Sequence, residues 1–444
     1  MVNRELAKPS FKEAFKFWLK LGFISFGGPA GQIAIMHTFL VEQKKWISES
    51  KFMHALNYCM LLPGPEAQQL ATYIGWLFHG IRGGIIAGLL FILPSIVLLL
   101  GLSILYVEYG DLVWVSNFLN GLKPAVIAII IGAMIKIGKK SLLGLEYYLI
   151  AIISFVLIFF FHVPFPYIVL GIILLSFLWL KFVQKSNSNS LSNSVSKSNN
   201  NVDESDYLIN KNSTIENLTY SKKTWGLIIS IAPILFVLPL IATIYFTDKP
   251  VFWTQLISFF TQAAFVTFGG AYAVLPYVAQ VSVIKYQWLT QFQMMDGLAL
   301  GESTPGPLII ILIFVGFMAG YNIYDGSIIM GGLGLFLTAL YTFLPSFVFI
   351  LVGAPFVEKS QQNILFKKIL GYVTAAVVGV ILNLSFYLTK ALLIPAHVSW
   401  YEINWLGLLW IVISVFALQV KKWNMILWLV ISGIVGVFIS FLSL

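Results

Sequence analysis

Long apolar runs separated by short polar stretches dominate the chain. Thirteen of these runs are long and apolar enough for membrane helices, because about 20 apolar residues span a bilayer core. Their expected limits are 13–40, 52–80, 84–106, 121–138, 147–161, 165–183, 225–246, 252–282, 291–320, 328–353, 369–388, 403–420 and 424–443. Within residues 1–21, Lys12, Lys16 and Lys20 lie four residues apart beside aromatic residues, as in an amphipathic helix at a membrane surface. The pattern predicts an all-α polytopic membrane protein.

Composition narrows the class further. Of the 444 residues, 59% are hydrophobic and 10% are charged, whereas about a quarter are charged in a soluble globular chain. A soluble enzyme, a secreted disulfide-rich domain and a nucleic-acid-binding protein are therefore excluded. The net charge of +9 comes from basic residues lying between apolar runs, which is typical of topology signals. Cys59 is the single cysteine, so an internal disulfide and a cysteine-based metal cluster are excluded as well.

One internal stretch has a different composition. From Ser186 to Asn201, 13 of 16 residues are Ser or Asn, and acidic residues follow. Such a sequence cannot bury enough apolar surface to offset the entropy of ordering, so residues 184–223 are predicted to be a disordered linker. The expected organisation is a first membrane repeat at 1–183, this linker, a connecting transmembrane helix at 224–250 and a second membrane repeat at 251–444.

The two flanks of the linker are related to each other. A shift of 242 residues places Phe26-Gly27-Gly28 on Phe268-Gly269-Gly270 and Pro63-Gly64-Pro65 on Pro305-Gly306-Pro307. After a small insertion, Pro94-Ser95 matches Pro345-Ser346 at a shift of 251. Such an ordered series of motifs indicates a tandem repeat of two membrane halves.

The basic residues predict how the halves are oriented. Most of the 27 Lys and Arg fall on the side of the N-terminus, the linker and Lys421-Lys422, so this side is expected to be cytoplasmic. An odd number of crossings separates the starts of the halves, which are therefore expected to be inverted repeats, as in many secondary transporters. The first two segments of each half are interrupted, and their pieces are short for a core of ~30 Å. They are either crossings or re-entrant hairpins, and both alternatives give inversion.

The interruptions carry the candidate chemistry. Each Pro-Gly-Pro breaks a helix inside apolar sequence, and its second proline is suited to start a new helix with unpaired backbone N–H groups. A helix N-terminus favours an anion, above all an oxyanion with several acceptor oxygens. The alternative is a set of kinks that let helices pack closely. The candidate substrate-binding residues are Gly27, Gly28, Pro29, Pro63, Gly64, Pro65, Gln69, Gly269, Gly270, Ser303, Thr304, Pro305, Gly306 and Pro307.

Charged residues near the interruptions suggest further roles. Glu66 follows the first Pro-Gly-Pro and Glu302 precedes the second, and both are candidates for proton coupling, since an ionised carboxylate would repel a bound anion. For Glu66 the alternative is a first-turn residue favourable to the helix dipole. Lys123 and Arg82 are candidates for attracting the anion, with snorkelling to the interface as the alternative role. No enzyme motif and no acidic cluster suited to metals accompanies them.

These motifs together resemble the chromate transporter family in its long, two-repeat form. The resemblance rests on Phe26-Gly27-Gly28-Pro29 with Trp46, Leu61-Leu62-Pro63-Gly64-Pro65 with Gln69-Leu70 and Gly75, Phe91-Ile92-Leu93-Pro94-Ser95, Phe268-Gly269-Gly270, and Gly301-Glu302-Ser303-Thr304-Pro305-Gly306-Pro307. It covers both halves and nearly everything except the linker, which is longer and more biased than the family pattern. The resemblance implies a carrier of chromate or a related oxyanion such as sulfate, with efflux as the expected direction, no organic cofactor and no enzymatic activity.

The resulting expectation is a secondary transporter of tetrahedral oxyanions that works by alternating access. An anion channel and a membrane receptor or scaffold without flux are the alternatives. The expected partners are the oxyanion and the lipid bilayer, with a homodimer as an option and no nucleic acid. The N-terminus and the linker are expected in the cytoplasm, and the plasma membrane is favoured over an organelle.

Overall fold

The computed structural model describes residues 8–186, 204, 206–210, 213, 220, 222–268, 271–357, 364–394 and 403–442. Within these ranges the chain is helical, and its one β-type pairing is an isolated bridge. Five helices among them are long and apolar enough to cross a membrane, at Glu66–Tyr109, Val113–Ser141, Thr224–Phe246, Ile328–Pro355 and Lys368–Leu393. Shorter apolar helices accompany them. The expected all-α architecture of an integral, multi-pass membrane protein is confirmed.

The two halves have closely related orders of helices. The first half contains α1 (Phe11–Ile24), α2 (Gly28–His37), η1 (Thr38–Gln43), α3 (Glu49–Cys59), α4 (Glu66–Tyr109), α5 (Val113–Ser141), α6 (Leu145–Phe159) and α7 (Phe165–Ser186). α8 (Lys222–Phe246) connects the halves. The second half contains α9 (Pro250–Phe265), η2 (Ala271–Ala273), α10 (Leu275–Ala279), η3 (Gln280–Lys285), α11 (Gln291–Ser303), η4 (Leu308–Ile310), α12 (Ile311–Ile323), α13 (Ile328–Val357), α14 (Ile364–Leu393), α15 (Trp405–Val415), η5 (Phe416–Val420) and α16 (Met425–Leu442).

Local geometry repeats along with the sequence. The segments η1 and η3 are both π-helical and begin 242 residues apart. Lys45 and Gln287, separated by the same shift, both have positive φ angles of 53° and 51°. Ser48 and Thr290 cap α3 and α11 in the same way, each accepting a hydrogen bond from the third backbone N–H of its helix. Two halves with the same deviations from regular helix share one folding plan.

The first apolar segment of each half folds back on itself. In the first half, Lys44 after η1 pairs with Glu13 near the start of α1 at 2.9 Å, and the Phe39 ring stacks on Phe17 with centroids 4.0 Å apart. In the second half, Tyr286 after η3 lies beside Phe259 of α9. Each segment is therefore a helical hairpin with its two ends together at a base, and in the first half its tip is at Gly27-Gly28.

The second apolar segment of each half is also a hairpin. Trp46 before α3 lies against Phe78 near the end of the first part of α4, with ring centroids 5.7 Å apart. Asn322 near the end of α12 donates to the Trp288 carbonyl before α11 at 2.8 Å. The tips of these hairpins are the two Pro-Gly-Pro motifs.

α4 consists of two helices joined by a tight turn. His79 and Gly80 have non-helical dihedral angles, so 66–78 and 81–109 are separate helices. Small residues line the seam between them, and a Cβ added to Gly75 would meet the Cβ of Ala87 at 2.5 Å. The two parts therefore run antiparallel in close contact, and the second part returns along the whole length of the hairpins. α12 and α13 repeat this arrangement in the second half.

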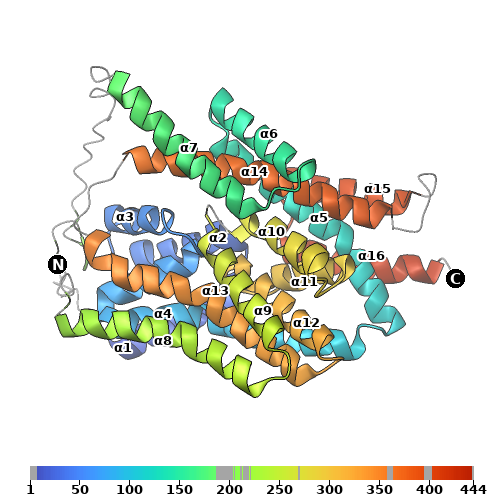
Figure 1. Cartoon of the computed structure of the whole chain (residues 1–444), viewed down its shortest axis with the longest axis horizontal. Coiled ribbons are helices and arrows are strands. Elements are labelled where there is room, and N and C mark those ends of the chain that lie inside the picture. The colour runs from blue at the N-terminus through green and yellow to red at the C-terminus, as the bar shows by residue number, and fades with distance from the viewer. Residues whose placement is uncertain are drawn as a thin grey trace.

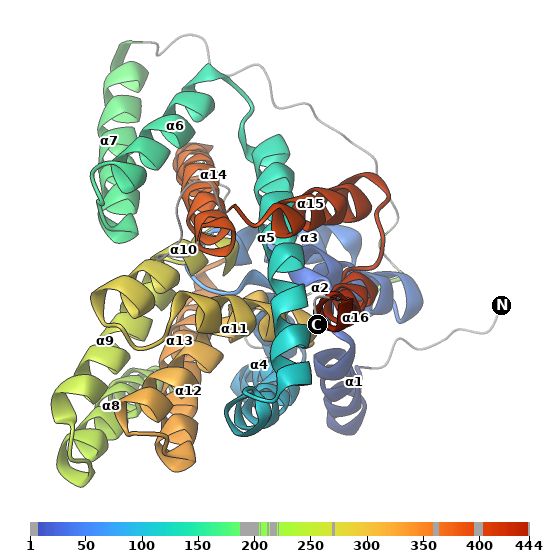
Figure 2. The same ribbon diagram turned by 90° about the vertical axis from the view of Figure 1, so that its right-hand side faces the viewer.

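The remaining helices interleave between the halves. α5 of the first half packs on α15 and α16 of the second. Its counterpart in the second half, α14, packs in the same way on α6 and α7 of the first. Figure 2 shows α5 between α14 on one side and α15 and α16 on the other. In Figure 1 the hairpins of the first half lie on the left and those of the second half on the right. α8 is largely exposed and lies at the outside of the molecule, where its apolar side chains can face lipid.

Part of the predicted linker is structured. Ile209 forms a parallel bridge with Ile47, the Ser48 N–H donates to the Ile209 carbonyl at 2.8 Å, and Lys45 pairs with Asp206 at 3.1 Å. The prediction of disorder across 184–223 is therefore wrong at residues 206–210, because the consecutive apolar residues Tyr207, Leu208 and Ile209 lie against the backbone at 45–48, at the base of the first hairpins. It is also wrong at residues 184–186 and 222–223, which belong to α7 and α8. Residues 187–203 of the linker lie outside the described residues.

Candidate functional site

The tips of the hairpins meet at one place between the halves, which we call the crossing. The Gly64 N–H donates to the Thr267 carbonyl at 2.7 Å, and the Gly306 N–H donates to the Ser25 carbonyl at 2.8 Å. Ser25 and Thr267 occupy equivalent positions of the repeat, as do Gly64 and Gly306. Each half therefore makes the same contact with the other, as at an interface with two-fold symmetry.

Local sequence explains why the chain turns at these points. Ser25 and Thr267 each follow the end of a helix, and their hydroxyls donate to carbonyls four residues earlier at 2.5 and 2.6 Å. Gly64 and Gly306 have φ angles of 124° and 96°, a region that favours glycine. The flanking prolines prevent either helix from continuing through the turn. The backbone N–H of each central glycine is thereby turned out of the helix and toward the other half.

A serine from each half supports the opposite Pro-Gly-Pro, but the two supports differ. Ser95 Oγ donates to the Pro305 carbonyl at 2.5 Å. The equivalent Ser346 lies against Gly64 and is buried, but its Oγ has no hydrogen-bond partner among the described residues. Gln69 Nε2 donates to the Pro63 carbonyl instead, at 2.8 Å. The turn at Pro63-Gly64-Pro65 is therefore held by a residue of its own half, and the Ser346 hydroxyl of the second half makes no hydrogen bond there.

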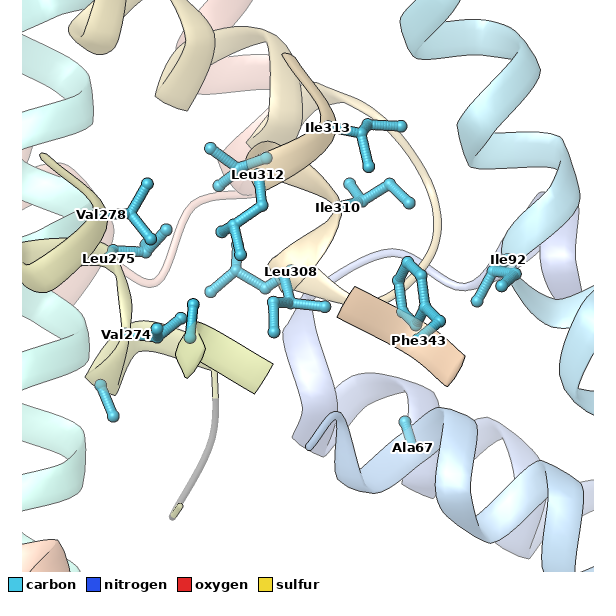
Figure 3. Close-up of a cluster of buried hydrophobic side chains, with 14 of the residues drawn as sticks. Ala67, Ile92, Val274, Leu275, Val278, Leu308, Ile310, Leu312, Ile313 and Phe343 are labelled. Carbon is cyan, nitrogen blue, oxygen red and sulfur yellow. The ribbon is translucent and has the colours of Figure 1, made fainter. Parts of the chain in front are cut away.

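The crossing is polar on the side of the first half and apolar on the side of the second. Three polar positions of the first half are apolar in the second. In the alignment of the repeat, Glu66 corresponds to Leu308, Gln69 to Ile311 and Gln32 to Val274. Figure 3 shows Leu308, Ile310 and Leu312 in a buried apolar cluster together with Val274 and Phe343. An ion at the crossing would find its polar partners in the first half.

Several buried polar atoms at the polar side are unsatisfied. Gln32 Nε2 donates to the carbonyls of Ser25 and Gly306, which ties the first hairpin to the crossing. The side-chain oxygens of Gln32, Gln68 and Gln69 have no partner among the described residues, and neither has Ser346 Oγ. Buried polar groups are almost always hydrogen-bonded, so this group of atoms marks a place for water or a polar ligand.

The start of α2 is the most open part of the crossing. Gly27 and Gly28 have no heavy atom within 4 Å of the position a Cβ would take. Pro29 lies in the first turn of α2, and the N–H groups of Gly28 and Ala30 have no acceptor among the described residues. Free N–H groups at a helix N-terminus carry partial positive charge, which favours an anion.

The other predicted residues occupy different positions around the crossing. Pro65 and Pro307 directly precede α4 and η4, as expected for new helix starts. The hydroxyls of Ser303 and Thr304 donate to backbone carbonyls near the end of α11, at 2.7 and 2.8 Å. The N–H groups of Gly64 and Gly306 are taken by the other half, so they are not free donors here. Gly269 and Gly270 lie outside the described residues.

The two glutamates flank the crossing from different halves. Glu302 is buried and accepts a hydrogen bond from the Tyr272 hydroxyl at 3.0 Å. Glu66 is the first residue of α4 and is half-buried. Both carboxyl groups lie within a few residues of a tip, as their places in the sequence suggested.

The two basic candidates are not at the crossing. Arg82 is exposed and follows the turn at His79-Gly80, at the base of the hairpins. Lys123 is buried and pairs with Asp296 of the second half, with Nζ 3.6 Å from Oδ1. The sequence analysis did not identify Asp296 as a partner of Lys123. The available signal was an acidic residue inside an apolar segment, which in a membrane protein calls for a partner.

Comparison with known proteins gives a consistent result. The family model for chromate transporters matches residues 12–177 and again residues 254–437. An uncharacterized transporter of Methanocaldococcus jannaschii is 27% identical over 96% of this chain and 94% of its own length. The chromate transport protein of Cupriavidus metallidurans is 26% identical over 86% of this chain and 83% of its own, and that of Pseudomonas aeruginosa is 29% identical over 84% and 79%. No solved structure gives a significant match.

Proposed function

The chain belongs to the chromate transporter family, and from this membership we propose that it carries tetrahedral oxyanions, chromate and the similar sulfate, across a membrane. Its relatives include proteins named for chromate transport, and they match this chain across both halves. The protein is thus a transporter rather than an enzyme, and the polytopic helical fold agrees with this role.

The observation that carries the proposal is the polar side of the crossing. The free N–H groups at the start of α2 belong to the first hairpin tip of the first half, and the Ser346 hydroxyl without a partner lies against Gly64 of the second tip. A tetrahedral oxyanion accepts hydrogen bonds from several directions at once, and the backbone N–H groups and the Ser346 hydroxyl can donate to it, while the amide oxygens accept from its bound water. Of the predicted residues, Gly27, Gly28, Pro29 and Gln69 are the ones we assign to this site.

We further propose that the two halves are inverted in the membrane. The hairpins of the two halves touch through their tips, and their bases lie at opposite ends of the molecule (Figure 1). Tips that meet head to head from opposite sides are the arrangement expected of re-entrant hairpins in inverted repeats. Of the two topologies left open by the sequence, this geometry favours the re-entrant one.

Such a crossing suits alternating access. The site lies between the hairpin tips of two structurally similar halves, and each half holds the tip of the other through one backbone hydrogen bond at its central glycine. A small rocking of one half against the other would expose the site to either side in turn. We propose that the N-terminus and the linker lie on the cytoplasmic side.

The test is uptake of labelled sulfate into proteoliposomes, with and without an imposed proton gradient and with excess chromate as competitor. We expect saturable, chromate-inhibited uptake. Absence of saturable flux of either anion through folded protein would refute the carrier function, and flux that never accumulates against a gradient would indicate a channel.

A matched pair of variants tests the site. Ala30→Pro deletes one free N–H in the first turn of α2, where no helical hydrogen bond is lost. Ser50→Pro places proline in the first turn of α3, at the base of the hairpins. We expect Ala30→Pro to weaken sulfate uptake strongly and Ser50→Pro to leave it near wild type. Equal activity of the two variants would refute the assignment of the α2 N-terminus.

A further inference from the structure

A second polar site lies away from the crossing, between α4, α5, α11 and α12. A cavity of about 240 Å³ is lined by residues of these four helices, including Lys123, Asp296, Tyr106, Asn120, Gln293 and Tyr321. This volume is many times the roughly 10–15 Å³ that one water needs, so a small hydrated ion fits. The cavity lies next to the turn between α4 and α5, which in the proposed topology faces the side opposite the linker.

The charged pair in this cavity joins the two halves. Lys123 belongs to the first half and Asp296 to the second, and their side chains are only 7% and 6% exposed. Their closest N···O distance is 3.6 Å, which is longer than a hydrogen bond. Lys123 Nζ instead donates to Asn120 Oδ1 at 2.6 Å. An ammonium has three donors, so Lys123 keeps donating capacity toward the cavity.

Asp296 is held on one side only. The Tyr106 hydroxyl donates to Asp296 Oδ2 at 3.0 Å, whereas Oδ1 has no hydrogen-bond partner among the described residues. The other titratable groups that line the cavity are Asp111 and Tyr321. Because the cavity holds two carboxylates and one ammonium, an incoming anion is admitted only when negative charge in the cavity is neutralised.

The repeat shows that this pair is not required by the fold. At the equivalent positions of the other half stand Val373 for Lys123 and His54 for Asp296. Val373 is buried in the apolar core, and the two positions form no ion pair. The same architecture is therefore built on one side of the crossing without this ion pair, which indicates that the pair has a task beyond packing.

We propose that this cavity is a proton-coupled anion-binding site, in which Lys123 exchanges Asp296 for the incoming oxyanion while Asp296 takes a proton from water in the cavity. The proton binds the carboxylate, with Oδ1 as the free acceptor, and the freed ammonium then binds an oxygen of the anion. No bond within the anion changes. This inference rests on the proposed function, because it names the coupling ion and the outer binding step of the same transport.

Asp296→Asn and Lys123→Gln separate the two roles. In wild type we expect the KM for sulfate uptake to fall as pH is lowered from 8 to 6. Asp296→Asn removes the competing charge, so its KM should be low and independent of pH, and a proton gradient should no longer drive accumulation. Lys123→Gln should raise KM at least tenfold, the loss expected for one charge-assisted hydrogen bond. The double variant leaves no unpaired buried charge, and we expect it to fold with high, pH-independent KM.

The control changes the exposed ion pair of Lys45 and Asp206. The double variant Lys45→Gln/Asp206→Asn should transport sulfate like wild type. Sulfate binding to purified protein, followed by thermal shift at both pH values, is measured in parallel. If wild type transports and Asp296→Asn keeps the wild-type pH dependence of KM, the inference is wrong while the carrier function stands. If wild type binds sulfate with the expected variant pattern but shows no flux, the site stands and the carrier function fails. Loss of proton coupling in Glu302→Gln but not in Asp296→Asn would also overturn the inference.

Discussion

The two serines at the crossing allow a sharp test of its geometry. In the second half the Pro305 carbonyl depends on Ser95, because the residue equivalent to Gln69 is Ile311, which cannot donate. In the first half Gln69 donates to the Pro63 carbonyl, and the Ser346 hydroxyl has no partner among the described residues. The Pro305 carbonyl therefore has a single side-chain donor, whereas a second hydroxyl, that of Ser346, is available for the Pro63 carbonyl.

This difference has a measurable size. Ser95→Ala leaves the Pro305 carbonyl buried without a donor, which should lower the free energy of unfolding by about 1–3 kcal/mol. Ser346→Ala removes a buried hydroxyl that has no partner, so we expect no loss and even a small gain in stability. Gln69→Ile should cost little, because Ser346 can turn its hydroxyl to the Pro63 carbonyl. The double variant Gln69→Ile/Ser346→Ala loses both donors and should cost the full ~1–3 kcal/mol.

Equilibrium unfolding in detergent, followed by tryptophan fluorescence, measures these effects as a double-mutant cycle. The prediction is a strong coupling between positions 69 and 346 and a large single effect at position 95. Additive effects of Gln69→Ile and Ser346→Ala, or a stable Ser95→Ala, would show that the carbonyls at the tips are held in another way. The same protein preparations can be reconstituted for uptake, and a rise in KM for Ser346→Ala at unchanged stability would place its free hydroxyl on the anion.

Three further predictions follow from the same geometry. Cysteines introduced at Lys45 and Gln287, which are exposed and equivalent in the repeat, should react with a membrane-impermeant thiol reagent from opposite sides of the membrane, and reaction from the same side would contradict inversion. Gly64→Ala should reduce the yield of folded protein as well as transport, as size-exclusion chromatography would show, because the residue needs positive φ and its Cβ would strike Ser346 Oγ. Glu302→Gln should keep thermal stability within about 0.5 kcal/mol, since its amide oxygen still accepts from the tyrosine hydroxyl, whereas Glu302→Ala should lose about 1–3 kcal/mol.

Much of the fold could be predicted from local signals. Apolar runs gave the helices, and Pro-Gly-Pro gave the breaks, because proline and glycine act on their own backbone. The repeat was visible since the same rare motifs occur twice in the same order. The structured part of the linker was missed for the opposite reason. Residues 206–210 form a short segment, and their order depends on backbone hydrogen bonds to residues 45–48 that no local pattern reveals.

The residues proposed for the site come from the sequence, but their hydrogen bonds do not. Sequence alone offers Gly64 and Gly306 as anion-binding residues, and nothing near them in the chain accepts their N–H groups. The structure pairs them with carbonyls of the other half, and a pairing between distant segments has no local signature. The same holds for Lys123 and Asp296, which have no oppositely charged residue in their own helices and come together only when α5 packs on α11.

The differences between the halves locate function better than the motifs themselves. Where the two halves agree, as at the central glycines, the residues serve the crossing and its two-fold contact. Where they differ, a polar or charged residue of the first half has an apolar residue at the equivalent position of the second, as Ile311 for Gln69 and Val373 for Lys123. A carrier built from two similar halves must still distinguish one side of the membrane from the other if a gradient is to drive it in one direction. The fold supplies the symmetry, so the direction of transport has to come from such unmatched positions, and exchanging Val373 for lysine together with His54 for aspartate would test whether a second charged pair makes transport respond equally to protons from both sides.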